Sequence, residues 1–274
     1  RSPRERVAKV APWLTLDGDP YPAIVDGKVQ WIIDGFTTSA GYPYSQTTSL
    51  STATTDALTV NSTSITAQSN KNINYIRNSV KATVDAYDGT VVLYQWDEKD
   101  PVLKTWMKAF PKTVTPKSEM SKQLLEHIRY PEDMFRVQRD VLSSYHVQTA
   151  SAFYGGQDFW RVPRDPSTFG ANAGAQPPYY MTLEMPGSDK PTFTLTTPFV
   201  PRGGRENLSA FAVVDSNYGP NYGKITVLQL PRSTNVAGPS QVASNFEAKP
   251  EVANSLSLLR QGGSDVVLGN LLTL

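Results

Sequence analysis

His127 and His146 are the only imidazole groups that the chain offers for acid–base or metal chemistry. They do not share the i, i+4 spacing at which two helical histidines bind one zinc ion. His127 falls in a helical pattern beside leucines, which indicates a surface or boundary position. His146 falls at the end of a predicted helix, where its ring can cap a carbonyl and a cation favours the dipole. A general base is the alternative for either residue, but the sequence names no partner, so we predict no catalytic residue and no metal site.

The short motifs of the common catalytic and nucleotide-binding sites are absent from the sequence. It contains no Gly-x-Ser-x-Gly elbow, no P-loop and no Gly-x-Gly-x-x-Gly fingerprint. The chain has no cysteine, which excludes thiolate nucleophiles and disulfides, and we predict no cofactor. A carboxylate pair for glycoside hydrolysis leaves no motif, because the two acids meet only in the fold. A hydrolase therefore stays open as an alternative to a non-enzymatic domain.

An aromatic group on an irregular segment is the strongest candidate for ligand binding. The segment from Phe153 to Tyr180 is rich in glycine, proline and aromatic residues. Such side chains can stack on sugars or surround an apolar ligand, and they can equally anchor an irregular loop to the core. With the nearby histidine, the candidate ligand-binding residues are Tyr154, Trp160, Tyr179, Tyr180 and His146.

The charge balance gives no electrostatic reason to expect nucleic acid or an anionic membrane surface as a partner. Lysine and arginine total 26, aspartate and glutamate total 25, and the formal net charge is +1. No apolar run approaches the roughly 20 residues that cross a bilayer. The chain starts at Arg1 and ends inside an apolar run at Leu274, so we expect a portion of a longer protein.

Antiparallel hairpins are the elements that must position these residues. Val80 to Val84 alternates apolar and polar residues, which predicts a half-buried strand, and Asp88-Gly89 suits the turn back through 91–96. A second hairpin is predicted around Asp26-Gly27 by the same device. Further strand pairs are expected at 179–185 with 192–196 and at 208–214 with 224–230.

Helices are expected in groups between these hairpins. Asp100-Pro101 suits the start of a helix that continues to Phe110, because proline lacks only a donor that is unpaired there. A second helical region covers 118–145, is interrupted at Pro131 and restarts with acidic residues. Residues 238–260 predict one or two helices, and 265–272 predicts a last strand. The sequence therefore predicts an α+β fold, with a mainly antiparallel sheet built from hairpins and grouped helices packed against it.

The domain organisation is expected to be simple. We predict one domain over 1–274, with a Ser/Thr-rich flexible loop at about 45–70 and a sub-boundary at about 165–178. The Ser/Thr-rich stretch is polar and poor in aromatics, which is typical of a surface loop or a partly disordered excursion.

Five long segments together resemble uncharacterised protein family 0182, which comprises large multi-span bacterial membrane proteins with a big extracytoplasmic region. These segments are 74–90 (NYIRNSVKATVDAYDGT), 127–147 (HIRYPEDMFRVQRDVLSSYHV), 153–163 (FYGGQDFWRVP), 178–187 (PYYMTLEMPG) and 260–272 (RQGGSDVVLGNLL). The resemblance covers nearly the whole chain and is weakest in the Ser/Thr-rich stretch.

The resemblance implies a place in the cell rather than a reaction. It implies that the chain is part of the extracytoplasmic region, on the outer side of the bacterial plasma membrane. It implies the membrane-spanning part of the same parent chain as a partner. We further expect an envelope lipid, glycan or protein partner, leave an oligomer open, and from the charge balance expect no nucleic acid. It carries over no catalytic residue. We therefore expect a non-enzymatic binding or scaffolding domain of the cell envelope, and the alternative is an envelope hydrolase acting on glycan, lipid or peptide.

Overall fold

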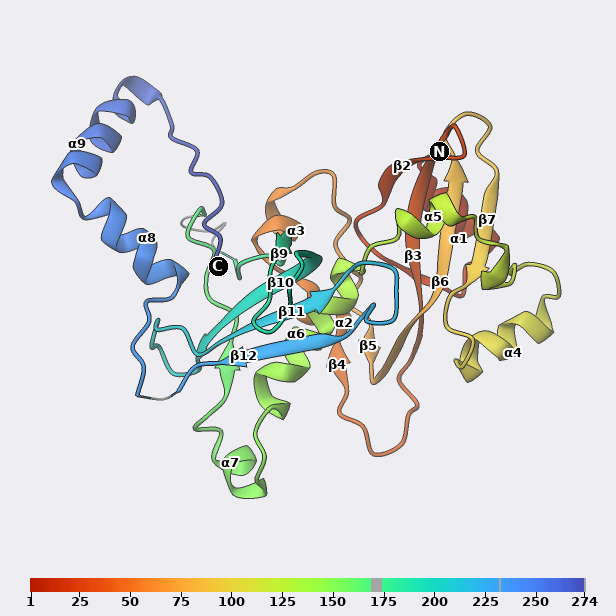
Figure 1. The fold of residues 1–274 in the computed structure, drawn as a ribbon, viewed down its shortest axis with the longest axis horizontal. Coiled ribbons are helices and arrows are strands. Elements are labelled where there is room, and N and C mark those ends of the chain that lie inside the picture. Colours follow the sequence, from red (N-terminus) through yellow and green to blue (C-terminus); the bar gives the residue numbers. More distant parts are fainter. Residues whose placement is uncertain (169–173, 232, 274) are drawn as a thin grey trace.

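Two five-stranded antiparallel sheets dominate the computed structural model, which describes residues 1–168, 174–231 and 233–273 (Figure 1). Helices from the intervening segments pack beside both sheets. The predicted α+β class with mainly antiparallel sheets is confirmed.

The first sheet is built around two long central strands. β3 (Lys28–Ser39) pairs with β6 (Tyr75–Asp85), and β7 (Val91–Gln95) follows on the outer side of β6. The free edge of β3 carries β2 (Tyr21–Val25) and β1 (Thr15–Leu16). Both predicted hairpins are confirmed.

The turns of these hairpins use the expected backbone geometry. Asp26, Gly27 and Gly89 have φ angles of 51°, 77° and 77°, in the left-handed region that Asp-Gly pairs tolerate. The identity of the turn residues therefore explains where the chain reverses.

The second sheet has β10 (Thr192–Pro201) at its centre. β11 (Ala210–Asp215) and then β12 (Ile225–Gln229) lie on one side of β10. β9 (Tyr179–Leu183) and β8 (Trp160–Arg161) share its other side. The two strand pairs predicted in this half of the chain are confirmed.

The helices group as the sequence predicts. The restart at Pro131 is confirmed, with Glu132 and Asp133 in the first turn of the longest helix. The helices before and around it are α1 (Pro3–Val10), α4 (Pro101–Ala109), η1 (Lys117–Glu119), α5 (Lys122–Glu126), α6 (Glu132–Tyr145) and α7 (Ala150–Gly155). Near the C-terminus, α8 (Pro239–Glu247), α9 (Pro250–Leu259) and η3 (Gln261–Gly263) follow, and α8 and α9 form an arm that stands away from the sheets in Figure 1.

The Ser/Thr-rich stretch contains short regular elements between irregular segments. It contains α2 (Leu50–Thr54) and α3 (Ala57–Asn61), and β4 (Thr48–Ser49) pairs with β5 (Asn72–Ile73). Asp56 is fully buried and caps α3. A few buried side chains within this polar stretch attach it to α6 (Glu132–Tyr145), and the predicted flexibility of the stretch stays a prediction.

Two sequence predictions are corrected. The 80–84 strand was expected to have one solvent face, but Lys81 and Thr83 are buried as well, since a second layer of side chains covers that face. Residues 265–272 form no strand, because this apolar run pairs with none of the strands that the structure describes. The predicted sub-boundary at 165–178 lies partly outside the described residues and stays a prediction.

Candidate functional site

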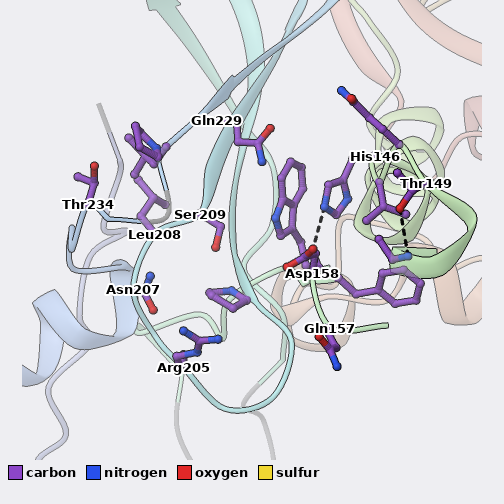
Figure 2. A pocket seen from close by; sticks show the side chains of 18 residues that line it. His146, Thr149, Gln157, Asp158, Arg205, Asn207, Leu208, Ser209, Gln229 and Thr234 are labelled. Carbon is purple, nitrogen blue, oxygen red and sulfur yellow. Dashed lines mark hydrogen bonds between the residues drawn. The ribbon is translucent and has the colours of Figure 1, made fainter. Parts of the chain in front are cut away.

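An open cavity of about 610 Å³ lies where the end of α6, α7 and β8 face the loops around β11 and β12. Figure 2 shows His146, Thr149, Gln157 and Asp158 along one side of it. On the other side are Arg205, Asn207, Leu208, Ser209, Gln229 and Thr234. The cavity therefore joins two walls that are distant in the sequence.

Helix ends position the first wall. His146 is the C-cap of α6, and the Thr149 hydroxyl caps α7 by accepting from the Ala152 N–H at 3.2 Å. Gly156 ends α7 with a φ of 60°, which turns the chain toward Phe159 and Trp160. Local capping chemistry thus places the polar groups of this wall at the cavity.

Strand connections position the second wall. The Arg161 guanidinium on β8 forms an ion pair with Glu206, and the Arg202 N–H donates to the Phe159 carbonyl at 2.7 Å. The Leu208 N–H donates to the Val236 carbonyl at 2.7 Å. These contacts hold the β10–β11 connection against both the first wall and the segment after β12.

His146 is committed to structural contacts. Its Nδ1 lies 2.8 Å from the Leu142 carbonyl oxygen and its Nε2 lies 3.0 Å from the Asp158 carbonyl oxygen. Its ring stacks on Trp160 with the centroids 3.4 Å apart, and Phe199 lies against Trp160 at 5.4 Å. Both ring nitrogens therefore lie against backbone carbonyl oxygens, and Trp160 lines the cavity.

The histidine-centred arrangement of a hydrolase is not found among the described residues. Such a site needs a histidine within hydrogen-bond reach of a carboxylate and a hydroxyl. His127 is exposed at the C-cap of α5, and its Nδ1 lies 2.8 Å from the Gln123 carbonyl oxygen. Among the described residues, the hydrogen-bonding atoms close to the two rings are backbone carbonyl oxygens, and not the carboxylate and hydroxyl that a general base needs.

The cavity lining combines uncharged groups that donate and accept hydrogen bonds with aliphatic side chains such as Leu208 and Leu230. Gln148, Gln157, Asn207 and Gln229 contribute amides, and Thr149, Ser209 and Thr234 contribute hydroxyls. The amides of Asn207 and Gln229 have no hydrogen-bond partner within the part of the chain that the structure describes. Phe159 adds an aromatic ring, and Arg205 and Asp158 add one charge of each sign. This chemistry suits a neutral ligand rich in hydroxyl and amide groups.

The five residues predicted for ligand binding do not form one site. His146 and Trp160 meet in the cavity, while Tyr154 lies outside it, with 91% of its surface exposed. Tyr179 and Tyr180 lie on β9, and the Tyr180 hydroxyl donates to the Tyr130 carbonyl. Whether any of the five binds a ligand stays a prediction.

Most of the cavity residues were not predicted. Arg205, Asn207, Ser209, Gln229 and Thr234 belong to turns and strand ends, where such polar residues are common for local reasons. Only the pairing of β10, β11 and β12 brings them together, so no local signal in the sequence identifies them.

A second group of chemically notable side chains is sealed inside the molecule. The Arg136 guanidinium contacts three carboxylates, with Nε 2.6 Å from Asp56, Nη2 2.9 Å from Glu132 and Nη1 3.1 Å from Asp133. Arg139 also binds Asp56, with Nη2 3.2 Å from the same carboxylate oxygen. This network ties the Ser/Thr-rich stretch to α6, which makes it structural.

Burial changes the proton affinities inside this network. It raises the pKa of Glu132 to about 7, although Arg136 acts in the opposite direction. Burial also lowers the pKa of Arg139 to about 10, although Asp56 opposes the change. Within the part of the chain that the structure describes, no group of acids and histidines has the arrangement of a metal site.

Comparison with known proteins shows that the chain matches one protein family. The family model described as "Uncharacterised protein family (UPF0182)" matches residues 1–259. A UPF0182 protein of Thermobifida fusca is 55% identical over 275 residues, covering 100% of this chain and 27% of the relative. The UPF0182 proteins of Streptomyces coelicolor and Kineococcus radiotolerans are 55% and 54% identical, and this chain covers 27% and 29% of them.

The chain thus spans about 27% of the length of its first relatives. No solved structure matches it. Among the described helices, none combines the length and apolar character needed to cross a membrane.

Proposed function

This chain belongs to the uncharacterised protein family UPF0182. We propose a function for it from the residues that line its cavity. It is a non-enzymatic binding domain of a longer integral membrane protein, on the extracytoplasmic side of the cell envelope. The cavity beside His146 holds an envelope glycan, and the membrane-spanning part of the parent chain is the partner of the domain.

One observation carries the glycan assignment. A cavity of about 610 Å³ is lined by amides, hydroxyls, two aromatic rings and several aliphatic side chains, and it opens to solvent. A sugar ring offers hydroxyls on its edge and C–H groups on its face, which match planar amides and an aromatic side chain. A lipid acyl chain would require a mainly apolar lining, so a lipid fits this cavity poorly.

Calorimetric titration with defined saccharides tests the proposal. The purified chain is titrated with chitotetraose, maltotetraose and muramyl dipeptide, and the proposal expects saturable binding of at least one of them. Asn207→Ala/Gln229→Ala removes two unpaired amides from the cavity and is expected to weaken that binding about tenfold or more.

A matched pair of variants separates the cavity from general effects. Gln241→Ala/Asn254→Ala removes two exposed amides from α8 and α9, outside the cavity, and is expected to leave binding unchanged. Absence of binding by all three probes contradicts the glycan assignment, and so does equal binding by the cavity variant and the wild-type chain.

A further inference from the structure

An apolar groove of about 500 Å³ lies between the end of α1 and α4, in the first-sheet half of the molecule. Trp13 stacks on Trp106 with centroids 5.4 Å apart, and Trp106 stacks on Phe110 at 5.9 Å. Val10 and Pro12 add aliphatic surface, and Val10 and Phe110 are 45% and 50% exposed. Large apolar side chains are normally more deeply buried, so this exposed cluster requires an explanation.

The charged residues in 6–16 and 101–118, the two segments that contribute the groove residues, are all basic. Residues 6–16 and 101–118 contain no aspartate or glutamate. Lys9 directly precedes Val10, and Lys112 directly precedes Thr113, which also lines the groove. Neither lysine forms an ion pair within the described ranges. The groove is therefore lined by aromatic and aliphatic residues, and the chain segments that contribute them carry lysines and no acid.

We propose that this aromatic groove (Val10, Pro12, Trp13, Trp106, Phe110 and Thr113) is a peripheral contact surface for an anionic lipid bilayer. Tryptophan and other aromatic residues are favoured at the boundary between headgroups and acyl chains. Lysines near such residues are attracted to anionic headgroups. The overall net charge of +1 does not argue against this contact with a bilayer. Salt screens distant charges, so the charges near the groove determine its attraction to anionic headgroups.

The composition of the groove favours lipid over the other occupants. A saccharide site needs several fixed hydrogen-bonding side chains, and Thr113 is the one lining residue with a hydroxyl. A protein partner would be matched by shape and apolar area, but it would not require lysines next to the lining residues in both segments. The bilayer accounts for both the aromatic and the cationic features. α4 and α7 lie apart in Figure 1, so this surface is separate from the cavity.

Vesicle co-sedimentation of the purified chain tests the proposal. We compare vesicles of phosphatidylcholine alone with vesicles that also contain phosphatidylglycerol, at low and high salt. The chain is expected to bind the anionic vesicles, and to bind them less at high salt. Val10→Ser/Phe110→Ser and Lys9→Glu/Lys112→Glu are each expected to reduce binding about tenfold or more.

Matched controls lie elsewhere on the surface. Ile24→Ser/Val29→Ser changes an exposed cross-strand apolar pair, 67% and 49% exposed, and Lys190→Glu/Lys224→Glu makes the same change in charge. Both controls are expected to bind like the wild-type chain, and circular dichroism checks that every variant is folded.

Three results would overturn the lipid assignment. One is no binding to either vesicle, and another is equal loss in the controls and the groove variants. The third is a lipid-free dimer that Val10→Ser/Phe110→Ser dissociates, because the groove would then be a protein interface. None of these results affects saccharide binding in the cavity, which is measured without lipid.

Discussion

Glu132 links the stability of the fold to pH. Its carboxylate is buried beside Arg136, and burial raises its pKa from 4.5 to about 7. Since the folded protein holds this proton more tightly than the unfolded chain, Glu132 stabilises the fold fully below about pH 4.5. That contribution is lost as the pH rises through about 7.

Glu132→Gln is expected to remove this pH dependence. Glutamine keeps an oxygen acceptor for Arg136 but does not titrate. The free energy of unfolding of the variant, minus that of wild type, should increase between pH 4.5 and 8 by on the order of 3 kcal/mol. Urea unfolding across this range measures it. Glu251→Gln, at an exposed position on α9, should show no such trend, and a flat difference for Glu132→Gln would contradict the assignment.

Asp56 is expected to be among the most sensitive positions for stability. Its carboxylate binds both Arg136 and Arg139, and all three side chains are buried. Asp56→Ala leaves two guanidinium groups short of a partner and should lower the free energy of unfolding by about 3–5 kcal/mol. Chemical denaturation measures the loss, and the exposed Asp265→Ala serves as the control. A loss below about 1 kcal/mol would show that the network contributes little.

The burial of Asp56 could not be predicted from the sequence. Asp56 lies in a stretch of serines and threonines, where its type suits a turn, a cap or an exposed position equally well. The arginines that bury it lie far along the chain, on α6. Asn207 and Gln229 pose the same difficulty in the cavity, because their chemistry becomes visible only when β11 and β12 are paired.

At the scale of elements, Asp100 fastens α4 to the first sheet. Its carboxylate accepts from the N–H groups of Val102 and Leu103 at 3.0 Å each, which caps the helix. It also accepts from hydroxyls of the sheet, namely Thr37 at 2.7 Å, Ser79 at 2.6 Å and Tyr75 at 2.5 Å. Burial opposes ionisation, yet these hydrogen bonds lower the pKa of Asp100.

Asp100→Ala is expected to destabilise the fold by about 3 kcal/mol, because it removes a cap and leaves buried hydroxyls without their acceptor. Because the pKa is lowered in the folded protein, the contribution of Asp100 is present above its unfolded pKa and is lost as the pH falls through the folded value. Thermal unfolding measures the change, with the exposed Asp189→Ala as control. Equal melting temperatures for the two variants would contradict the role.

Elements with a strong local signal were predictable. The Asp-Gly turns and the Asp100-Pro101 cap each specify a backbone geometry within a few residues, and the structure has both hairpins and α4 there. The apolar run at 265–272 failed as a strand because strand formation also requires a partner, which no local pattern reports. The burial of Lys81 was also not predictable from a local pattern. The alternation of apolar and polar residues at 80–84 predicted that Lys81 faces solvent, but Tyr222 and Asp34 contact its amino group.

At the scale of the molecule, the arm formed by α8 and α9 is expected to be the least stable part. Pro239 is the one buried residue of α8, and α9 has none. With so little burial, the arm should open without unfolding the sheets. Hydrogen exchange should give protection in α9 that is on the order of a hundredfold lower than in β6. Equal protection in the two elements would mean that the arm unfolds only with the whole domain.

Native mass spectrometry shows directly whether the cavity binds a glycan. The purified chain is mixed with soluble saccharide fragments released from the envelope of Streptomyces coelicolor, the source of one relative. The proposal predicts an added mass that corresponds to sugar, that is lost on denaturation, and that Asn207→Ala/Gln229→Ala retains poorly. A chain that acquires no sugar mass, or a cavity variant that retains it as well as wild type, would contradict the claim.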